Sequence, residues 1–214
     1  MFIVLVAGAS GSGKTTIVKH MKSVLNENGI SVTIISVDQF YRSMHPHEPR
    51  NWDHLSAINM DALEECVRSL KENKSVRIPD YDYVTHQSIP NSILIGGESQ
   101  VVIVEGLFSL CDNRLCSLAD MKIYVEADLL KHCLPRRFHR DVNERGRSGE
   151  SIIDQYVKQV IPGFEEFVLP SKVYADIAIP NHGSHPHQNT PFIKIVCNYI
   201  IDQVKGDTKF SSDD

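Results

Sequence analysis

Apolar and polar positions follow one another in blocks that predict strands and helices in turn. Residues 2–7 are apolar throughout, which is typical of a strand that is buried on both faces. Residues 15–28 instead carry apolar side chains with a helical period, and a glycine follows them. The same patterns predict strands at residues 31–37, 101–104, 122–125 and 177–179, and helices at residues 60–71, 129–143, 150–160 and 192–204.

The order of these elements predicts the fold class. Strands that alternate with helices form a parallel sheet covered on both faces, so we expect an α/β fold with a five-stranded parallel sheet. Residues 76–95 break the alternation, because they are rich in β-branched and aromatic side chains and are interrupted by prolines. This stretch predicts a β-hairpin over one edge of the sheet. We expect residues 1–204 to form a single domain and residues 205–214 a frayed polar tail.

Composition excludes several classes of protein. The chain has 214 residues with 42% hydrophobic and 23% charged residues, as in ordinary globular proteins, and its net charge of -5 disfavours a nucleic-acid partner. No apolar run approaches the roughly 18 residues of a membrane span, and no export signal precedes the first strand, so we expect a cytoplasmic protein without a membrane partner. Five cysteines without a Cys-x-x-Cys pair predict reduced thiols, and the His-Pro-His runs at 45–47 and 185–187 predict solvated loops.

The strongest chemical signal lies between the first strand and the first helix. The pattern G-x-x-x-x-G-K-[ST] predicts a P-loop, in which glycines let backbone N–H groups surround phosphate oxygens at a helix N-terminus. The lysine would reach the β- and γ-phosphates, and the hydroxyl of the last residue would hold Mg²⁺. The expected ATP-binding residues are Gly8, Ala9, Ser10, Gly11, Ser12, Gly13, Lys14, Thr15 and Thr16.

Two acids follow predicted strands at the same edge of the sheet. Glu105 ends the strand at residues 101–104, where a carboxylate beside a P-loop positions Mg²⁺ together with Thr15. Asp38 lies just past the strand at residues 31–37 and is placed to accept a proton from an attacking hydroxyl, because ligands bind beyond the carboxyl ends of parallel strands.

Five arginines fall within residues 136–147 of an otherwise acidic chain. They lie at a predicted helix end next to a glycine-containing joint, which favours a lid over phosphate oxygens at residues 136–160 rather than a merely solvated face.

Further motifs resemble the uridine–cytidine kinase family of P-loop nucleoside kinases. They are residues 38–42 (Asp-Gln-Phe-Tyr-Arg), 51–54 (Asn-Trp-Asp-His), 78–86 (Ile-Pro-Asp-Tyr-Asp-Tyr-Val-Thr-His) and 140–147, which fit Arg-Asp-x-x-x-Arg-Gly-Arg. The resemblance implies that Asp38 is the catalytic base. It also implies a triphosphate role for Lys14, Arg140 and Arg145, and a substrate role for Asp53 (ribose), Tyr81 and His86 (base), Arg137, Arg147, Gln155 and Tyr41.

The expected activity is transfer of the ATP γ-phosphoryl to the 5′-hydroxyl of uridine or cytidine, with Mg²⁺ as cofactor. The P-loop core leaves nicotinamide riboside kinase and phosphoribulokinase-like kinases as alternatives, and Tyr81 and His86 argue against both. An alternative of another class is a non-catalytic nucleotide-binding regulator, although Asp38, Lys14 and Glu105 are all present. Family analogy alone suggests a homotetramer.

Overall fold

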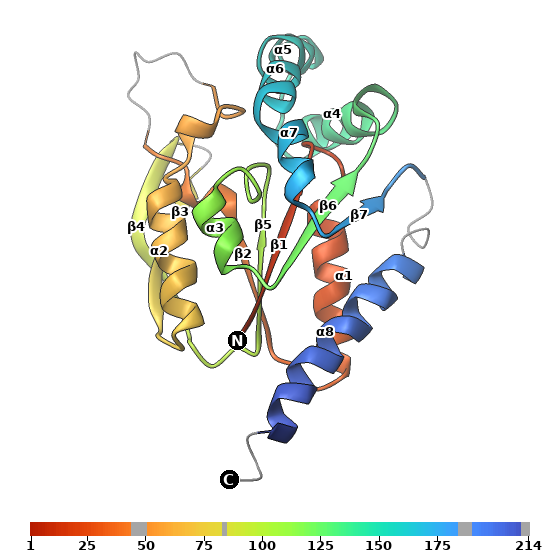
Figure 1. Ribbon diagram of the computed structural model, residues 1–214. Coiled ribbons are helices and arrows are strands. Elements are labelled where there is room, and N and C mark those ends of the chain that lie inside the picture. Colours follow the sequence, from red (N-terminus) through yellow and green to blue (C-terminus); the bar gives the residue numbers. More distant parts are fainter. Residues whose placement is uncertain (44–50, 83–84, 184–189, 211–214) are drawn as a thin grey trace.

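A five-stranded parallel sheet forms the centre of the computed structural model, which describes residues 1–43, 51–82, 85–183 and 190–210, with side chains as far as residue 206. Its strand order is β2-β5-β1-β6-β7, so β1 lies in the middle (Figure 1). The strands are β1 (Phe2–Gly8), β2 (Val32–Ser36), β5 (Val101–Glu105), β6 (Met121–Glu126) and β7 (Ile177–Pro180). This confirms the predicted fold class. Both His-Pro-His runs lie outside the described residues.

Helices cover both faces of the sheet. Successive side chains of β1 point to opposite faces, and all of them are apolar, so both faces need a cover. Ile3 and Leu5 point into a core shared with α2 (Met60–Lys71) and α3 (Asn113–Leu118). Val4 and Val6 point into a second core, shared with α1 (Lys14–Glu27) and α8 (Thr190–Phe210). The near-continuous apolar run of β1 is therefore explained by burial on two sides.

The predicted hairpin is present as a separate antiparallel pair, β3 (Val76–Asp82) and β4 (Gln87–Ile95). It lies beside α2 on the β2 side of the molecule (Figure 1). Ile78, Tyr81 and Ile95 are buried against the core that α2 also covers, which fixes the hairpin on the sheet edge.

Two predicted helices differ from the structure at prolines. The helix expected at residues 129–143 begins as a π-helical turn (Leu129–Cys133) and becomes α4 (Leu134–Asn143) just before Pro135. The helix expected at residues 150–160 continues to residue 174 and contains two prolines, which lack the N–H donor of an α-helical hydrogen bond. Its α-helical turns alternate with π-helical turns and it ends in a 3₁₀ turn, so the chain stays helical past both prolines. Its α-helical parts are α5 (Gly149–Gln155), α6 (Ile161–Gly163) and α7 (Leu169–Ser171).

Two more boundaries differ from the sequence prediction. Helix α3 was not predicted; the Asp112 side chain caps it by accepting from the N–H groups of Arg114 and Leu115. Helix α8 extends past residue 204 to Phe210, so the segment expected to be a frayed tail begins as helix. A single glycine at position 206 weakens a helix without ending it.

All five cysteines are free, as predicted. Burial raises the pKa of Cys66 and of Cys111 to about 12, and that of Cys133 to about 11, which makes these thiols weak nucleophiles. In the described part of the chain, the helices are too short or too polar to cross a membrane.

Candidate active site

The loop between β1 and α1 has the conformation that a phosphate cradle needs. Gly11 and Gly13 adopt φ angles of 81° and 94°, a left-handed region that side chains with a Cβ rarely enter. A Cβ at Gly11 would also overlap the carbonyl oxygen of Cys133, and one at Gly13 the side chain of Asn181. Glycine is therefore required at both positions, for backbone conformation and for close packing.

The Lys14 side chain folds back onto the first residues of this loop. Its Nζ donates to the carbonyl oxygens of Gly8 and Ala9 at 3.0 Å each. Burial lowers the pKa of Lys14, and the nearby carboxylates of Glu105 and Asp38 act in the opposite direction. The ammonium is thus held in a dry site, where its charge acts strongly on any anion that enters the loop.

Thr15 and Glu105 meet because β1 and β5 are neighbours in the sheet, with Val6 opposite Glu105. The Thr15 hydroxyl donates to Oε1 of Glu105 at 3.0 Å. Burial raises the pKa of Glu105, while the charge of Lys14 lowers it. A hydroxyl and a carboxylate are hard oxygen ligands that suit Mg²⁺, which keeps several waters; the described residues contain no cluster of three or more acidic, His or Cys ligands.

Asp38 lies within a capped turn that follows the end of β2. Ser36 opens this 3₁₀ turn (Val37–Phe40), its hydroxyl accepting from the Asp38 N–H at 3.3 Å. Ser36 is also the neighbour of Glu105 across the sheet. The charge of Asp38 raises the pKa of Lys14, Glu105 and Asp53, so its carboxylate lies within electrostatic reach of the P-loop and of Asp53.

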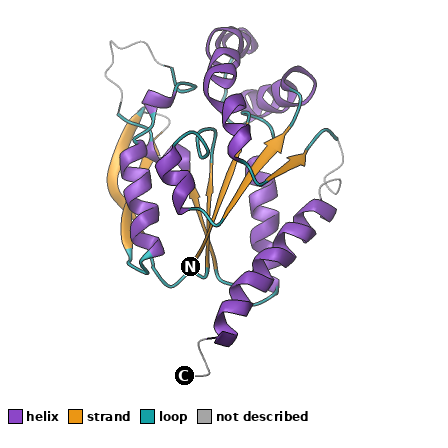
Figure 2. Ribbon diagram, viewed as in Figure 1, coloured by secondary structure: helices purple, strands orange, loops and turns teal. Residues whose placement is uncertain are grey.

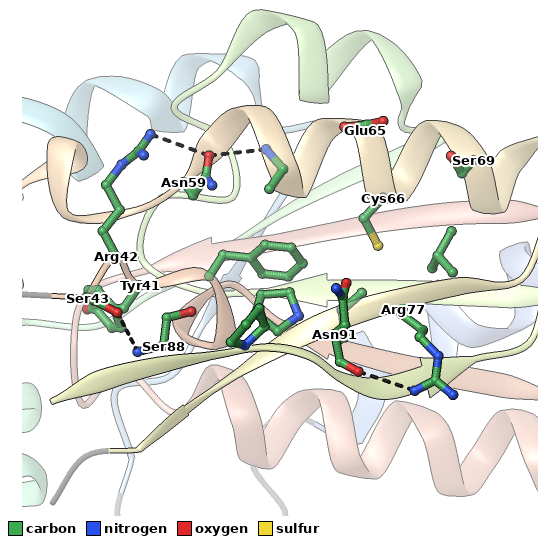
Figure 3. Close-up of a pocket in the computed structure, with 16 residues that line it drawn as sticks. Tyr41, Arg42, Ser43, Asn59, Glu65, Cys66, Ser69, Arg77, Ser88 and Asn91 are labelled. Carbon is green, nitrogen blue, oxygen red and sulfur yellow. Dashed lines mark hydrogen bonds between the residues drawn. The ribbon is translucent and has the colours of Figure 1, made fainter. Parts of the chain in front are cut away.

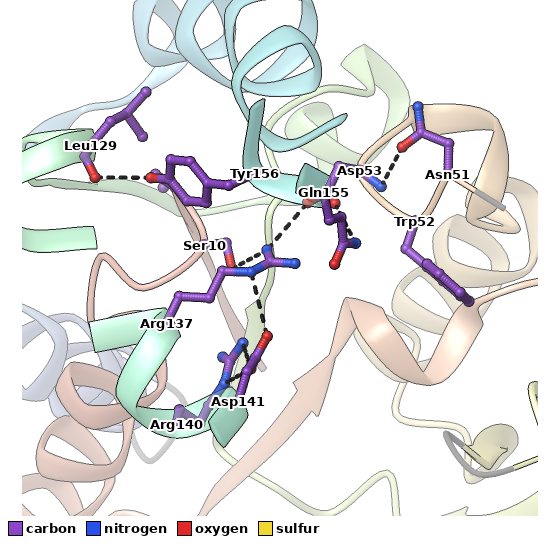
Figure 4. Close-up of polar contacts among 12 residues, drawn as sticks. Ser10, Asn51, Trp52, Asp53, Leu129, Arg137, Arg140, Asp141, Gln155 and Tyr156 are labelled. Carbon is purple, nitrogen blue, oxygen red and sulfur yellow. Dashed lines mark hydrogen bonds and ion pairs between the residues drawn. The ribbon is translucent and has the colours of Figure 1, made fainter. Parts of the chain in front are cut away.

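Asp53 belongs to a buried polar cluster that includes Arg137 and Gln155 (Figure 4). Its Oδ1 lies 3.6 Å from Nη1 of Arg137, and its Oδ2 accepts from Nε2 of Gln155 at 3.3 Å. Arg137 also donates to the Ser10 hydroxyl at 2.9 Å, which links the cluster to the P-loop. Burial raises the pKa of Asp53 and Arg137 opposes this, so the carboxylate is an acceptor held in a largely dry site.

The arginines of residues 136–147 do not act as one group. Arg137, Arg140, Arg145 and Arg147 all lie within 3.6 Å of the carboxylate of Asp141, which is fully buried. Sequence analysis did not single out Asp141. The spacing contained a signal, because Asp141 is four residues after Arg137 and shares a face of α4 with it, and Arg145 follows four residues later, in the turn after the helix.

Arg136 is not one of the arginines that contact Asp141. It joins the P-loop to the segment after β7 by hydrogen bonds. Its guanidinium donates to the carbonyl oxygens of Ser12, Asn181 and Gly183 at 3.5, 3.3 and 2.9 Å. The Asn181 side chain donates to the same Ser12 oxygen at 2.6 Å. This contact spans 169 residues, so the sequence pattern alone could not place it.

Aromatic side chains join the hairpin to the segment that carries Asp53. Trp52 donates from Nε1 to the Tyr81 hydroxyl at 3.3 Å, and its ring lies 5.0 Å from that of His86. The Tyr41 hydroxyl donates to the Trp52 carbonyl at 2.9 Å, and its ring is 5.2 Å from that of Tyr81. Tyr41 therefore packs against Tyr81 of the hairpin. Trp52 belongs to the same aromatic cluster, although the sequence analysis assigned it no role.

The Phosphoribulokinase / Uridine kinase family model matches residues 3–187 of the chain. The chain belongs to this family.

Similar proteins agree with this assignment. A uridine kinase of Macrococcus caseolyticus is 40% identical over 188 residues, which are 86% of this chain and 89% of that protein. A uridine kinase of Saccharomyces cerevisiae is 36% identical over 206 residues; they cover 93% of this chain, which thus spans only 40% of that longer relative. The phosphoribulokinase of Rhodobacter spheroides shares the fold, with a TM-score of 0.62 at 21% identity over 87% of this chain and 74% of that one.

Two of the cavities in the described part of this family member share residues with the predicted substrate site. One of about 520 Å³ shares Arg147 and Gln155 with the predicted substrate residues and is also lined by Trp52. Gln155 joins this cavity to Asp53, to which it donates. The other, of about 620 Å³, is a groove between α2 and the hairpin that shares only Tyr41 with the predicted site (Figure 3). The first cavity is therefore the candidate acceptor site.

Proposed function

We propose that this protein is an ATP-dependent uridine/cytidine kinase that forms UMP and CMP. The observation that carries the proposal is that Arg137 joins the phosphate cradle to Asp53, by donating to the Ser10 hydroxyl and pairing with the Asp53 carboxylate. Asp38 follows β2, whose last residue lies opposite Glu105, and its charge acts on both Lys14 and Asp53. A base between a bound triphosphate and a bound hydroxyl is what in-line phosphoryl transfer requires.

In the proposed reaction, the 5′-oxygen of the nucleoside forms a bond to the γ-phosphorus while the bond to the β-γ bridging oxygen breaks. The hydroxyl proton passes to Asp38, and ADP leaves with the bridging oxygen. Lys14, Arg140 and Arg145 neutralise the charge on the transferred group. The Thr15 hydroxyl and Glu105 would hold Mg²⁺, which supplies further charge neutralisation at the phosphates.

Asp53 and the hairpin would recognise the nucleoside. A carboxylate held by Arg137 and Gln155 in a dry pocket suits the ribose hydroxyls, which donate to it. The rings of Trp52, Tyr81 and His86 offer polar atoms in an aromatic setting, which suits the edge of a planar base. A neutral histidine can both donate and accept, so the pair of Tyr81 and His86 is compatible with uracil and with cytosine.

We further propose a cytoplasmic enzyme with small-molecule partners and, by family analogy, a homotetrameric assembly. Five free cysteines, three of them buried, support a reducing compartment.

The activity is tested by ATP consumption with uridine, cytidine, adenosine, nicotinamide riboside and ribulose 5-phosphate, in wild type and in His86→Phe. We expect kcat/KM to be highest for the two pyrimidines. The substitution leaves a buried base edge unpaired, at about 1–3 kcal/mol, so kcat/KM for uridine and cytidine should fall about ten- to a hundred-fold and unequally. A wild type that prefers another acceptor contradicts the function, and a His86→Phe enzyme unchanged on both pyrimidines contradicts the role of the hairpin.

Asp53→Ala should discriminate between sugars. We expect kcat/KM to fall far more for uridine than for 2′-deoxyuridine, because only the ribonucleoside has a 2′-hydroxyl that can donate to the carboxylate. The matched control is Asp61→Ala, since Asp61 is exposed on α2 and pairs with Arg114. Equal losses for both sugars would show that Asp53 only supports Arg137 and Gln155.

A further inference from the structure

The carboxylate of Asp141 is the common partner of four arginines. Figure 4 shows it beside two of them, Arg137 and Arg140. Its Oδ1 accepts from Nε and Nη2 of Arg140 at 2.9 and 2.8 Å, and Nη1 of Arg145 lies 3.4 Å from the same oxygen. Its Oδ2 lies 3.4 Å from Nη1 of Arg147 and 3.6 Å from Nε of Arg137. The side chain is 0% exposed, so this charge is shielded from water and acts on the guanidinium groups alone.

The two carboxylate oxygens divide these arginines by the substrate that each would serve. Arg140 and Arg145, on Oδ1, are the pair proposed to meet the triphosphate, and their side chains are 35% and 44% exposed. Arg137 and Arg147, on Oδ2, contact Asp53 and Gln155, which are proposed to meet the nucleoside. One carboxylate therefore contacts arginines from both halves of the proposed site.

Electrostatics gives Asp141 a second effect. Four guanidinium groups face one carboxylate, so the group carries a net charge of about +3 without Asp53. Removing the carboxylate would raise that charge by one at a distance where charges interact strongly. The half-exposed Arg140 and Arg145 can exchange this oxygen for phosphate oxygens, whereas Arg137 is 7% exposed and remains in place.

We propose that Asp141 is a positioning residue that aligns the four arginines and acts as their internal counter-ion until a triphosphate binds. The proposal rests on the proposed function for its kinetic consequence, and on the charge cluster alone for its effect on anion binding. It assigns to Asp141 no contact with the reacting atoms.

The test compares wild type with Asp141→Asn and Asp141→Glu, with Asp61→Asn as the matched surface control. Affinity for inorganic tripolyphosphate is measured by calorimetry, and kcat and KM are measured with ATP and uridine. We expect Asp141→Asn to bind tripolyphosphate about five-fold more tightly, because a competing negative charge is gone. We also expect its kcat to fall about a hundred-fold without a rise in KM for ATP, because the arginines lose their alignment.

Asp141→Glu separates charge from placement. It keeps the counter-ion but moves it by one methylene, so tripolyphosphate affinity should stay within two-fold of wild type while kcat falls at least ten-fold. If Asp141→Asn does not fold, this variant decides by the same two measurements, and a wild-type kcat would overturn the proposal.

A purely structural role predicts a different pattern. Weaker tripolyphosphate binding in Asp141→Asn, together with a raised KM for both substrates, would overturn the proposal. A wild type without nucleoside kinase activity would overturn the proposed function instead, and the change in tripolyphosphate affinity would still report on Asp141.

Discussion

Asp38→Asn is expected to lower kcat by about 10²–10⁴-fold while nucleoside affinity stays nearly unchanged. Asparagine keeps the size of the side chain but cannot accept the proton of the 5′-hydroxyl. The substitution also removes a negative charge that raises the pKa of Asp53 and of Glu105, so both carboxyls become easier to ionise.

The measurement is steady-state kinetics with uridine, combined with calorimetric binding of uridine. Asp61→Asn is the control, because it makes the same change on an exposed ion pair of α2. An Asp38→Asn enzyme with a near wild-type kcat would remove Asp38 from the mechanism, since binding alone would then account for catalysis.

Lys14→Ala should weaken both ATP binding and the chemical step. The ammonium is 8% exposed and spans the loop between the carbonyl oxygens of Gly8 and Ala9, so its loss removes charge that acts in the ground state and in the transition state. We expect kcat to fall about 10²–10³-fold and KM for ATP to rise, in contrast to the selective loss of kcat in Asp38→Asn.

Lys74→Ala is the control for this variant, because Lys74 is exposed and pairs with Glu72. Binding of a non-hydrolysable ATP analogue to each variant separates the two effects of Lys14. Unchanged analogue affinity in Lys14→Ala would show that the lysine serves the loop conformation and not the nucleotide.

Local pattern determined much of this protein from the sequence alone. The apolar run at residues 2–7 favours a strand buried on both faces, because it is short and a glycine-rich stretch follows it at once. The P-loop is equally local, since its glycines, Lys14 and Thr15 are consecutive and their chemistry depends on one strand-to-helix turn. Asp38 and Glu105 could be proposed because both follow strands whose carboxyl ends share one edge of the sheet.

Only the tertiary structure decided how the charged groups pair. Thr15 and Glu105 are 90 residues apart, and Arg137 and Ser10 are 127 residues apart, so no spacing rule connects them. The run of arginines looked uniform in sequence, yet packing turned Arg136 toward backbone carbonyls and gathered its neighbours around the buried Asp141. Burial is what gives these contacts their strength, and burial is a property of the folded chain that local periodicity cannot express.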